Sequence, residues 1–387
     1  MTYDQVYVAP APTGNDANIG TNALTPFATV THALSVSGNG TVVHIAAGLY
    51  NTNSGEIFPL TISSKSSVKL LGTNRVVTVI NATGANRRVL TLDGVGGSCR
   101  IEGLALTGGN EPANPGGGVW INSCPDVTFA ACAITSNTAS SGGGAAYGGG
   151  LYAIASTVTL TNCLVEQNTI VGGNQAHGYG GGISLNGNTL TVRDSIIDAN
   201  RAIAGANGNW NGYGAGLHVG GGSAVLMNSL LYGNDCVSTN FQGQAALQYG
   251  DGVFVGGGAL QVLSCTIVTN RGQGINRGGG LVTVTNSIVW NNGIDVTGTV
   301  SLAYCDFGVA DTNAITNACI SADPCFNYTA TNDYRIQDRS PCINLGSTQG
   351  WMTNSLDLAG TPRILDGVVD IGAYETALPC GTVFRLR

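Results

Sequence analysis

The sequence predicts an all-β protein, a right-handed parallel β-helix with three short strands in each coil. One observation is an asparagine that recurs five residues after a small Cys or Ser, at steps of 31, 32, 34, 36 and 22 residues. A second is a glycine cluster before a strand-like apolar run in each repeat. Such periodicity is typical of a solenoid, in which each coil buries its apolar face only against its neighbours. The repeated asparagines are Asn137, Asn168, Asn200, Asn234, Asn270 and Asn292.

A β-propeller is the main alternative fold for repeats of this length. Its blades need about four antiparallel strands in ~40–45 residues. The 22-residue step between Asn270 and Asn292 is too short for a blade and fits one bare coil. The longer steps then hold loops that are inserted on one side of the coils. These loops are expected in the segments 138–147, 169–179, 202–213 and 237–249.

The chain divides into three parts, which together form one continuous solenoid. Residues 1–50 are predicted to cap the N-terminus, residues 51–304 to form the coils, and residues 305–387 to form an irregular closing region. A cap is needed because a terminal coil exposes apolar side chains and unpaired strand edges.

The predicted N-terminal cap contains a strand and a short helix. The strand lies at Val6–Val8, and the helix covers residues 25–34 with Thr25 as its N-cap and Pro26 in its first turn. The apolar strand segments Val6–Val8 and Thr382–Phe384 could each add to the open end of a neighbouring subunit and build a filament. The alternative is that they cap their own chain.

Composition excludes several classes of function. Only 10% of the residues are charged, the net charge is −7, and two lysines accompany 13 arginines. No basic patch is present to neutralise phosphates, which argues against nucleic acid as a partner. No apolar run approaches the ~18 residues of a membrane-spanning helix. The sequence also contains no GxSxG, P-loop or HExxH motif, and it indicates no cofactor.

Eight of the eleven cysteines fall into two groups. Those on the repeating Cys/Ser position are expected to be small buried residues, because free cysteine packs as a small hydrophobe. A second group in the closing region favours a disulfide staple whose pairing the sequence does not give. A staple and the few lysines favour export, although no signal peptide precedes the first strand. The second group is Cys319, Cys325, Cys342 and Cys380.

Equivalent residues in stacked parallel coils lie about 4.8 Å apart, so functional groups are expected in columns. The asparagine column is expected to be a structural ladder of side-chain hydrogen bonds. On the first strand of each repeat, an aromatic column should point outward, as a surface that binds glycan or a protein partner. The alternative is that the inserted loops cover it. This column contains Trp120, Tyr152, His218 and Phe254. His218 has no second ligand on its face, so no metal site is predicted.

An acidic pair on the third strand is the only candidate for catalysis. Glu166 and Asp198 should face outward on adjacent coils, since their burial would be unfavourable. Two neighbouring carboxyl groups raise one pKa and can supply an acid and a base or nucleophile. The alternative is a pair of solvated acids, or an ion pair with nearby arginines such as Arg193.

Several stretches of the closing region match a known pattern: Asp323–Phe326, Asp333–Ile336, Ser340–Ile343, Thr361–Arg363 and Val369–Glu375. In these stretches the chain resembles bacterial secreted or surface β-helix proteins of the choice-of-anchor Q type. Its first 50 residues look like the opening of the same class. The resemblance implies a parallel β-helix and a surface location, and it carries over no catalytic motif.

The leading hypothesis is therefore a non-enzymatic, exported protein at the cell surface or outside the cell. It would act as a structural or adhesive protein that associates with itself or binds glycan. The alternative is a polysaccharide lyase or glycoside hydrolase that uses Glu166 and Asp198. An enzyme requires a cleft with converging polar groups, whereas an adhesin or fibre requires exposed faces or ends.

Overall fold

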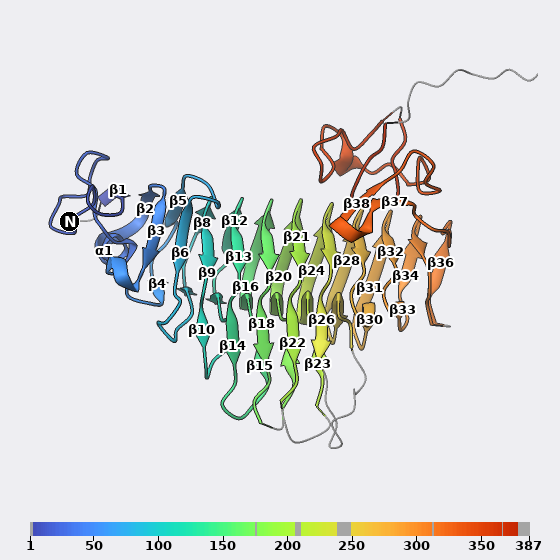
Figure 1. The fold of residues 1–387 in the computed structure, drawn as a ribbon, viewed down its shortest axis with the longest axis horizontal. Helices are drawn as coiled ribbons and strands as arrows, with labels where there is room; N and C mark the ends of the chain where they lie inside the picture. Colours follow the sequence, from blue (N-terminus) through green and yellow to red (C-terminus); the bar gives the residue numbers. More distant parts are fainter. Residues whose placement is uncertain are drawn as a thin grey trace, which may run out of the picture.

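The computed structural model describes residues 3–174, 176–205, 210–237, 249–311, 313–365 and 367–377. Its strands stack in parallel as successive coils along one axis, as Figure 1 shows. Each complete coil contributes one strand to each of three faces. The predicted three strands per coil are confirmed.

The first face includes the strands that follow the glycine clusters ending at Gly118, Gly150 and Gly182. It consists of β4 (Leu60–Ser63), β7 (Leu90–Asp93), β11 (Val119–Asn122), the first halves of β16 (Leu151–Thr161), β20 (Ile183–Arg193) and β24 (Leu217–Met227), then β27 (Val253–Val255), β30 (Gln273–Arg277) and β33 (Ile294–Thr297). The second halves of the three long strands continue into the second face.

The second face includes the first strand and the last strand of the solenoid. It consists of β1 (Tyr3–Val8), β2 (Ser37–Ile45), β5 (Lys69–Gly72), β8 (Ser98–Glu102), β12 (Asp126–Ala130), the ends of the three long strands, β28 (Ala259–Leu263), β31 (Leu281–Thr285), β34 (Ser301–Ala303) and β36 (Ile315–Asn317).

The third face is a separate sheet of ten strands. It consists of β3 (Gly48–Asn51), β6 (Thr78–Asn81), β9 (Ala105–Thr107), β13 (Ala133–Thr135), β17 (Leu164–Glu166), β21 (Ile196–Asp198), β25 (Leu230–Tyr232), β29 (Thr266–Val268), β32 (Ile288–Trp290) and β35 (Asp306–Phe307). Val, Ile and Leu from all three faces fill one continuous core.

The predicted asparagine ladder is present at the corner after the third face. Asn137 Nδ2 donates to Asn168 Oδ1 at 3.0 Å, and the same bond repeats on every step as far as Asn292. From Asn168 onward, each Oδ1 also accepts the backbone N–H of the asparagine on the coil before it, as between Asn137 N and Asn168 at 3.1 Å. The ladder side chains are almost fully buried. The hydrogen-bonding groups of their side-chain amides are therefore satisfied by one another and by backbone groups.

An aspartate ends the ladder, which the repeat pattern did not reveal. Asp295 Oδ1 accepts from the backbone N and the Nδ2 of Asn292, both at 2.9 Å. Its Oδ2 accepts from Gly308 N at 3.0 Å and Val309 N at 2.8 Å. A carboxylate serves here because four donors converge on it and it presents only acceptors.

The glycine clusters are required by the ladder beside them. A Cβ on Gly150 would lie 2.7 Å from Gly182 O and 2.8 Å from Asn168 Cγ. The first-face strand therefore approaches the ladder so closely that no side chain fits between them. This explains why a glycine cluster and an asparagine recur together.

The inserted loops add short strands beyond the ladder. One sheet consists of β10 (Asn110–Glu111), β14 (Thr138–Ser140), β18 (Thr169–Val171), β22 (Arg201–Ile203) and β26 (Asp235–Val237), and another of β15 (Ala146–Tyr147), β19 (Gly178–Tyr179) and β23 (Gly212–Tyr213). The tyrosines that end the latter strands stack face to face, with ring centroids 5.1 Å and 5.0 Å apart. Tyr249 extends the stack at 5.1 Å from Tyr213.

The N-terminal cap differs from the prediction in the position of its helix. α1 is Val30–Val36 and begins after Thr29, whose side chain accepts from His32 N. Residues 25–28 are not helical because the backbone of Phe27 pairs with Tyr7 and Ala9. These bonds also occupy the end of the outer edge of β1, so this part of the strand is capped by its own chain. The segment 382–384 lies outside the described residues.

The coils continue through β35 and β36 to Ile320, past the predicted boundary at residue 304. The closing region that follows folds back onto the side of the solenoid, over the third face (Figure 1). It contains an antiparallel hairpin of β37 (Phe326–Tyr328) and β38 (Asp333–Ile336) and three-residue 3-10 turns η2 (Thr329–Thr331) and η3 (Gly350–Met352), while η1 (Thr52–Ser54) belongs to the N-terminal part. Cys319, Cys325 and Cys342 are free thiols, which corrects the predicted staple among them. Cys342 instead donates to Asp306 Oδ2 at 3.1 Å. Cys380 lies outside the described residues.

The ladder predicts a large effect of one substitution. In Asn200→Ala, the side chains of Asn168 and Asn234 lose their hydrogen bonds to the side chain at position 200 and stay buried. We expect the free energy of unfolding to fall by about 4 kcal/mol, since each buried group left unpaired costs about 1–3 kcal/mol. Denaturant unfolding followed by circular dichroism measures it. Asn110→Ala, which removes one exposed bond to Asn86, is the matched control and should change stability by less than about 0.5 kcal/mol. Equal effects of the two variants would contradict a stabilising ladder.

Candidate functional site

The predicted aromatic column points away from the core, but the inserted loops cover much of it. Tyr147 stacks on Tyr152 with centroids 5.5 Å apart, and Tyr179 lies 4.8 Å from His218. Tyr152 and His218 are only 6% and 4% exposed. The expectation that these two side chains are exposed is therefore corrected, because the tyrosine stack lies over them. Phe254 remains half-buried beside Tyr213.

Burial beneath the tyrosine stack changes the protonation of His218. Its Nδ1 lies 2.9 Å from Ser184 Oγ, and complete burial lowers the pKa of the imidazole to about 3. The ring is therefore neutral at physiological pH and serves as a packed aromatic residue. Among the described residues, no three His, Cys, Asp or Glu side chains are grouped so as to hold a metal ion.

Trp120 is the member of the column that lines a cavity. The cavity measures about 390 Å³ and lies where the inserted loops begin. Arg88 lies over the indole ring with its guanidinium carbon 5.3 Å from the ring centroid, and its Nε is 3.4 Å from Glu111 Oε2. Arg87 is exposed at the same cavity. Two cationic side chains and one aromatic ring therefore meet here.

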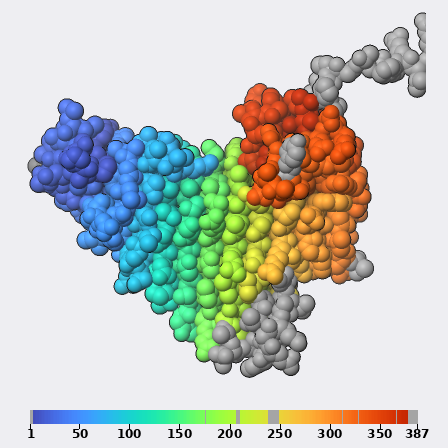
Figure 2. Space-filling view, in the orientation of Figure 1, coloured from blue at the N-terminus to red at the C-terminus, as the bar shows by residue number. Residues whose placement is uncertain are grey.

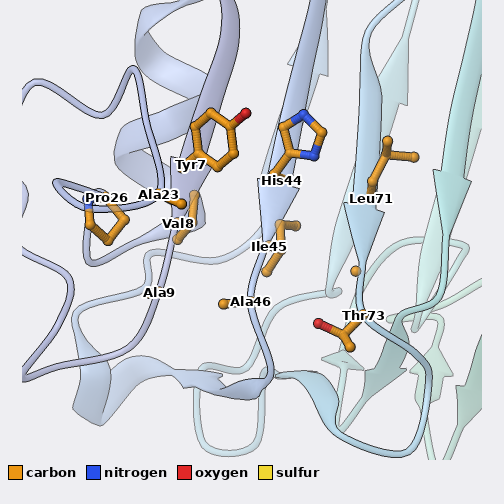
Figure 3. Close-up of a pocket in the computed structure, with 11 residues that line it drawn as sticks. Tyr7, Val8, Ala9, Ala23, Pro26, His44, Ile45, Ala46, Leu71 and Thr73 are labelled. Atoms are coloured by element: carbon orange, nitrogen blue, oxygen red, sulfur yellow. The ribbon is translucent and has the colours of Figure 1, made fainter.

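A smaller cavity of about 310 Å³ lies near the N-terminal cap (Figure 3). The rings of Tyr7 and His44 stack at 4.7 Å, and Leu71 follows them in the same row across β1, β2 and β5. Most of the lining is apolar. His44 Nε2 has no hydrogen-bond partner within the described parts of the chain. The size and lining fit a small group better than a polymer.

A larger recess is a groove of about 770 Å³ between the third face and the closing region. Figure 2 shows a step in the surface where the closing region rises above the coils. The groove is lined by Arg75, Asn162, Cys163, Leu164, Arg193, Asp194, Ile196, Asn354, Ser355, Leu356, Asp357, Leu358, Ala359, Gly360 and Tyr374. It combines segments that are far apart in the sequence.

The floor and rim of the groove differ in polarity. Leu164 and Ile196, which begin β17 and β21, are half-buried apolar side chains, and Tyr374 also lines the groove from the closing region. Two arginines stand on the rim. Arg193 Nε pairs with Asp194 Oδ2 at 2.9 Å, and Arg75 Nη1 donates to Asn162 O at 2.5 Å. A guanidinium has five N–H donors, so further hydrogen bonding is open to both.

A second polar column consists of Asn162, Asp194, Asn228 and Asn286, and its contacts determine the position of the groove. Its residues end the turns before the third face with φ near +50°, a conformation that Asn and Asp tolerate. Asn228 Nδ2 donates to Leu356 O at 2.9 Å, and Asn286 exchanges two bonds of 2.7 Å with Ser347. The later coils therefore hold the closing region. On the earlier coils, Asn162 and Asp194 line the groove instead.

The predicted acidic pair lies beside the groove floor. Glu166 and Asp198 end the strands that Leu164 and Ile196 begin, and they are paired in register. Asp198 is only 4% exposed, which corrects the expectation of a solvated side chain. Tyr232, which packs against Tyr334 of the closing region, donates a hydrogen bond to Asp198.

Burial is the main cause of the raised pKa of Asp198. Desolvation, followed by the nearby charge of Glu166, raises the pKa of Asp198 to about 6. Its Oδ1 has no hydrogen-bond partner in the described structure. The pair therefore combines a carboxyl group that protonates near neutral pH with a second, half-buried carboxyl group on the preceding coil.

Comparison with known proteins supports the same fold. Residues 66–255 match the family described as "Right handed beta helix region". The chain is a right-handed parallel β-helix. A solved structure titled "Crystal structure of pectate lyase Pel9A" has a TM-score of 0.65 to it, with 17% sequence identity and 97% of each chain covered. Likeness at this identity shows the fold alone. No curated protein matches the sequence. None of the helices among the described residues has the length and apolarity needed to cross a membrane.

The raised pKa of Asp198 predicts a pH-dependent effect of Asp198→Asn. A raised folded-state pKa means that the native state binds the proton more tightly than the unfolded state, whose Asp titrates near 3.9. The wild type therefore loses stability as pH rises from about 4 to about 6. We expect Asp198→Asn to be more stable than the wild type by about 2 kcal/mol at pH 8 and equal to it below pH 4.

Unfolding in denaturant at several pH values measures this difference. Subtracting the wild-type curve removes the titration of other groups, such as Asp251, whose pKa burial also raises to about 6. Glu102→Gln, which alters an exposed ion pair with Arg100, is the control and should give a flat difference. A difference of Asp198→Asn that does not change with pH would refute the assignment.

Proposed function

We propose that this chain is an exported protein that binds a polysaccharide in the groove between the third face and the closing region. The carrying observation is the apolar floor of Leu164 and Ile196 beneath a hydrogen-bonding rim. Sugar rings present apolar faces and hydroxyl edges, and a long open groove accommodates a polymer. Binding of this kind supports a structural or adhesive role at the cell surface.

The charges of the groove favour an acidic polysaccharide. Asp357 accepts backbone N–H groups of Ala359, Thr361 and Glu375, so its carboxylate is already engaged. Asp194 is engaged by Arg193 and by Asn228. The donors left over belong to Arg75 and Arg193, and guanidinium groups bind carboxylates well. The solved neighbour is titled a pectate lyase, so pectate is the first candidate ligand.

Self-association is a further part of the proposal. End-to-end growth through β1 is disfavoured, because the loop that precedes α1 already bonds to the outer edge of this strand. Side-by-side contact of the long faces remains open to copies of the chain, as does contact through β36, which pairs with β34 alone among the described strands.

Ile196→Trp tests the groove, because a large ring on its floor fills the space that the polymer needs. We expect at least a tenfold loss of affinity for the polysaccharide that the wild type binds from a panel of pectate, alginate, xylan and neutral glucans. Affinity electrophoresis and calorimetry measure it.

Thr107→Trp is the matched control, since Thr107 also lies on the third face but outside the groove. It should bind as the wild type does. Arg193→Ala should weaken binding of acidic polymers more than neutral ones. A wild type that binds no member of the panel, or equal losses in both tryptophan variants, would refute the proposal.

A glycoside hydrolase or polysaccharide lyase is the second candidate function. The observation in its favour is Asp198, a carboxyl group with a pKa of about 6 on the coil next to Glu166 and beside the groove floor. Groups with perturbed pKa values beside a recess are candidates for acid–base chemistry. The cover over Asp198 argues against direct contact with a substrate, so this candidate ranks below binding.

Incubation with the polysaccharide that binds distinguishes the two functions. Hydrolysis releases reducing ends, and β-elimination releases an unsaturated product. Under the binding proposal we expect neither product, and Glu166→Gln and Asp198→Asn should retain the wild-type affinity. Turnover that disappears in these variants but persists in Glu102→Gln would establish the enzymatic function in place of simple binding.

A further inference from the structure

The last coil of the solenoid places two cysteines one above the other. Cys305 precedes β35, and Cys319 follows β36 at the equivalent position of the next coil. Ile320 N donates to Cys305 O at 2.8 Å, and Tyr304 N donates to Asn317 O at 3.0 Å, which fixes this register. Equivalent Cα atoms in neighbouring parallel strands lie about 4.8 Å apart, within the range of about 4.4–6.8 Å found for disulfides.

The two thiols also contact each other. Their side chains form a hydrogen bond, and Cys305 has no exposed surface while Cys319 is half-exposed. The hydrogen bond from Cys305 is the main cause that lowers the pKa of Cys319 to about 6. Cys319 is therefore the exposed and more acidic thiol of the pair, and it has a second sulfur directly behind it.

We propose that Cys305 and Cys319 form a disulfide that closes the last coil when the protein meets a small-molecule disulfide such as oxidised glutathione. The Cys319 thiolate attacks one sulfur of oxidised glutathione, which forms a mixed disulfide and releases one glutathione thiolate. Cys305 then loses its proton and attacks the Cys319 sulfur, which releases the second glutathione. Two protein thiols are oxidised, and one oxidised glutathione is reduced to two molecules of glutathione.

The position gives this cross-link a structural consequence. β36 is the last strand of the second face, it is exposed, and it pairs with β34 alone among the described strands. The chain leaves the coils directly after Ile320 to form the closing region that walls the groove. A bond from Cys319 to Cys305 therefore fastens the open end of the solenoid where the closing region begins.

Another stacked pair provides an internal control. Cys132 and Cys163 also occupy equivalent positions on neighbouring coils, where Leu164 N donates to Cys132 O at 2.9 Å. Both are buried, and burial raises their pKa values to about 12 and about 11. They have neither the exposure nor the thiolate needed for attack, so they should stay reduced under the same treatment.

Peptide mapping of the full chain tests the proposal. The purified protein is treated with oxidised glutathione or with a reductant, its remaining thiols are alkylated after denaturation, and the digest is analysed by mass spectrometry. We expect a peptide that links Cys305 to Cys319, two fewer alkylated cysteines, and full alkylation of Cys132 and Cys163. Hydrogen exchange in β36 should slow on oxidation, and the slowing should be absent in Cys305→Ser and Cys319→Ser.

Other outcomes would overturn the proposal. These are a persistent glutathione adduct on Cys319 without cross-linking, a bond from Cys319 to Cys325, Cys342 or Cys380, and a disulfide between two copies of the chain. The linked peptide is sought in the wild type, so the test does not depend on the folding of a variant. It is also independent of polysaccharide binding, because neither cysteine lines the groove.

Discussion

The buried asparagine ladder is the constraint on which the rest of the structure depends. Each amide must find its partner one coil away, so the coils stay in register over the whole length of the ladder. The first-face strand must approach closely enough that only glycine fits beside the amides. Inserted residues can then leave the coil only beyond this corner. That is where the extra strands and the tyrosine stack lie. The ladder ends where Asp295 supplies acceptors to every converging donor.

A second polar column organises the closing region and thereby creates the groove. Asn228 and Asn286 bind its backbone, while Asn162 and Asp194 line the groove that it walls. The groove is thus the part of a continuous docking surface that the closing region leaves uncovered. Its apolar floor follows from the same geometry, because Leu164 and Ile196 occupy positions that the closing region covers on later coils.

Repeats made the fold predictable from the sequence, because spacing alone fixes which residues stack. The coils, the ladder and the buried Cys/Ser column follow from that spacing. Burial on the outer faces does not, because it depends on segments distant in the sequence. Asp198 and His218 both point away from the core, as alternation predicts, and both are buried. Asp198 lies beside Tyr232, which packs against the closing region, and His218 lies beneath the tyrosine stack. The helix was misplaced for a similar reason, since Phe27 pairs with β1.

The difference between residues placed by the repeat spacing and residues covered by distant segments also limits how far function can be inferred. A β-helix that aligns over 97% of its length with another at 17% identity shares its coils. Coils supply columns of backbone and core residues, which differ little in chemistry from one solenoid to the next. Arg193 and Asp194 line the groove where the closing region meets the coils, and the buried Asp198 lies on the adjoining strand β21. Under the proposed binding function, specificity depends on the docking of the closing region against the coils, and a change at that junction alters the groove without altering the fold.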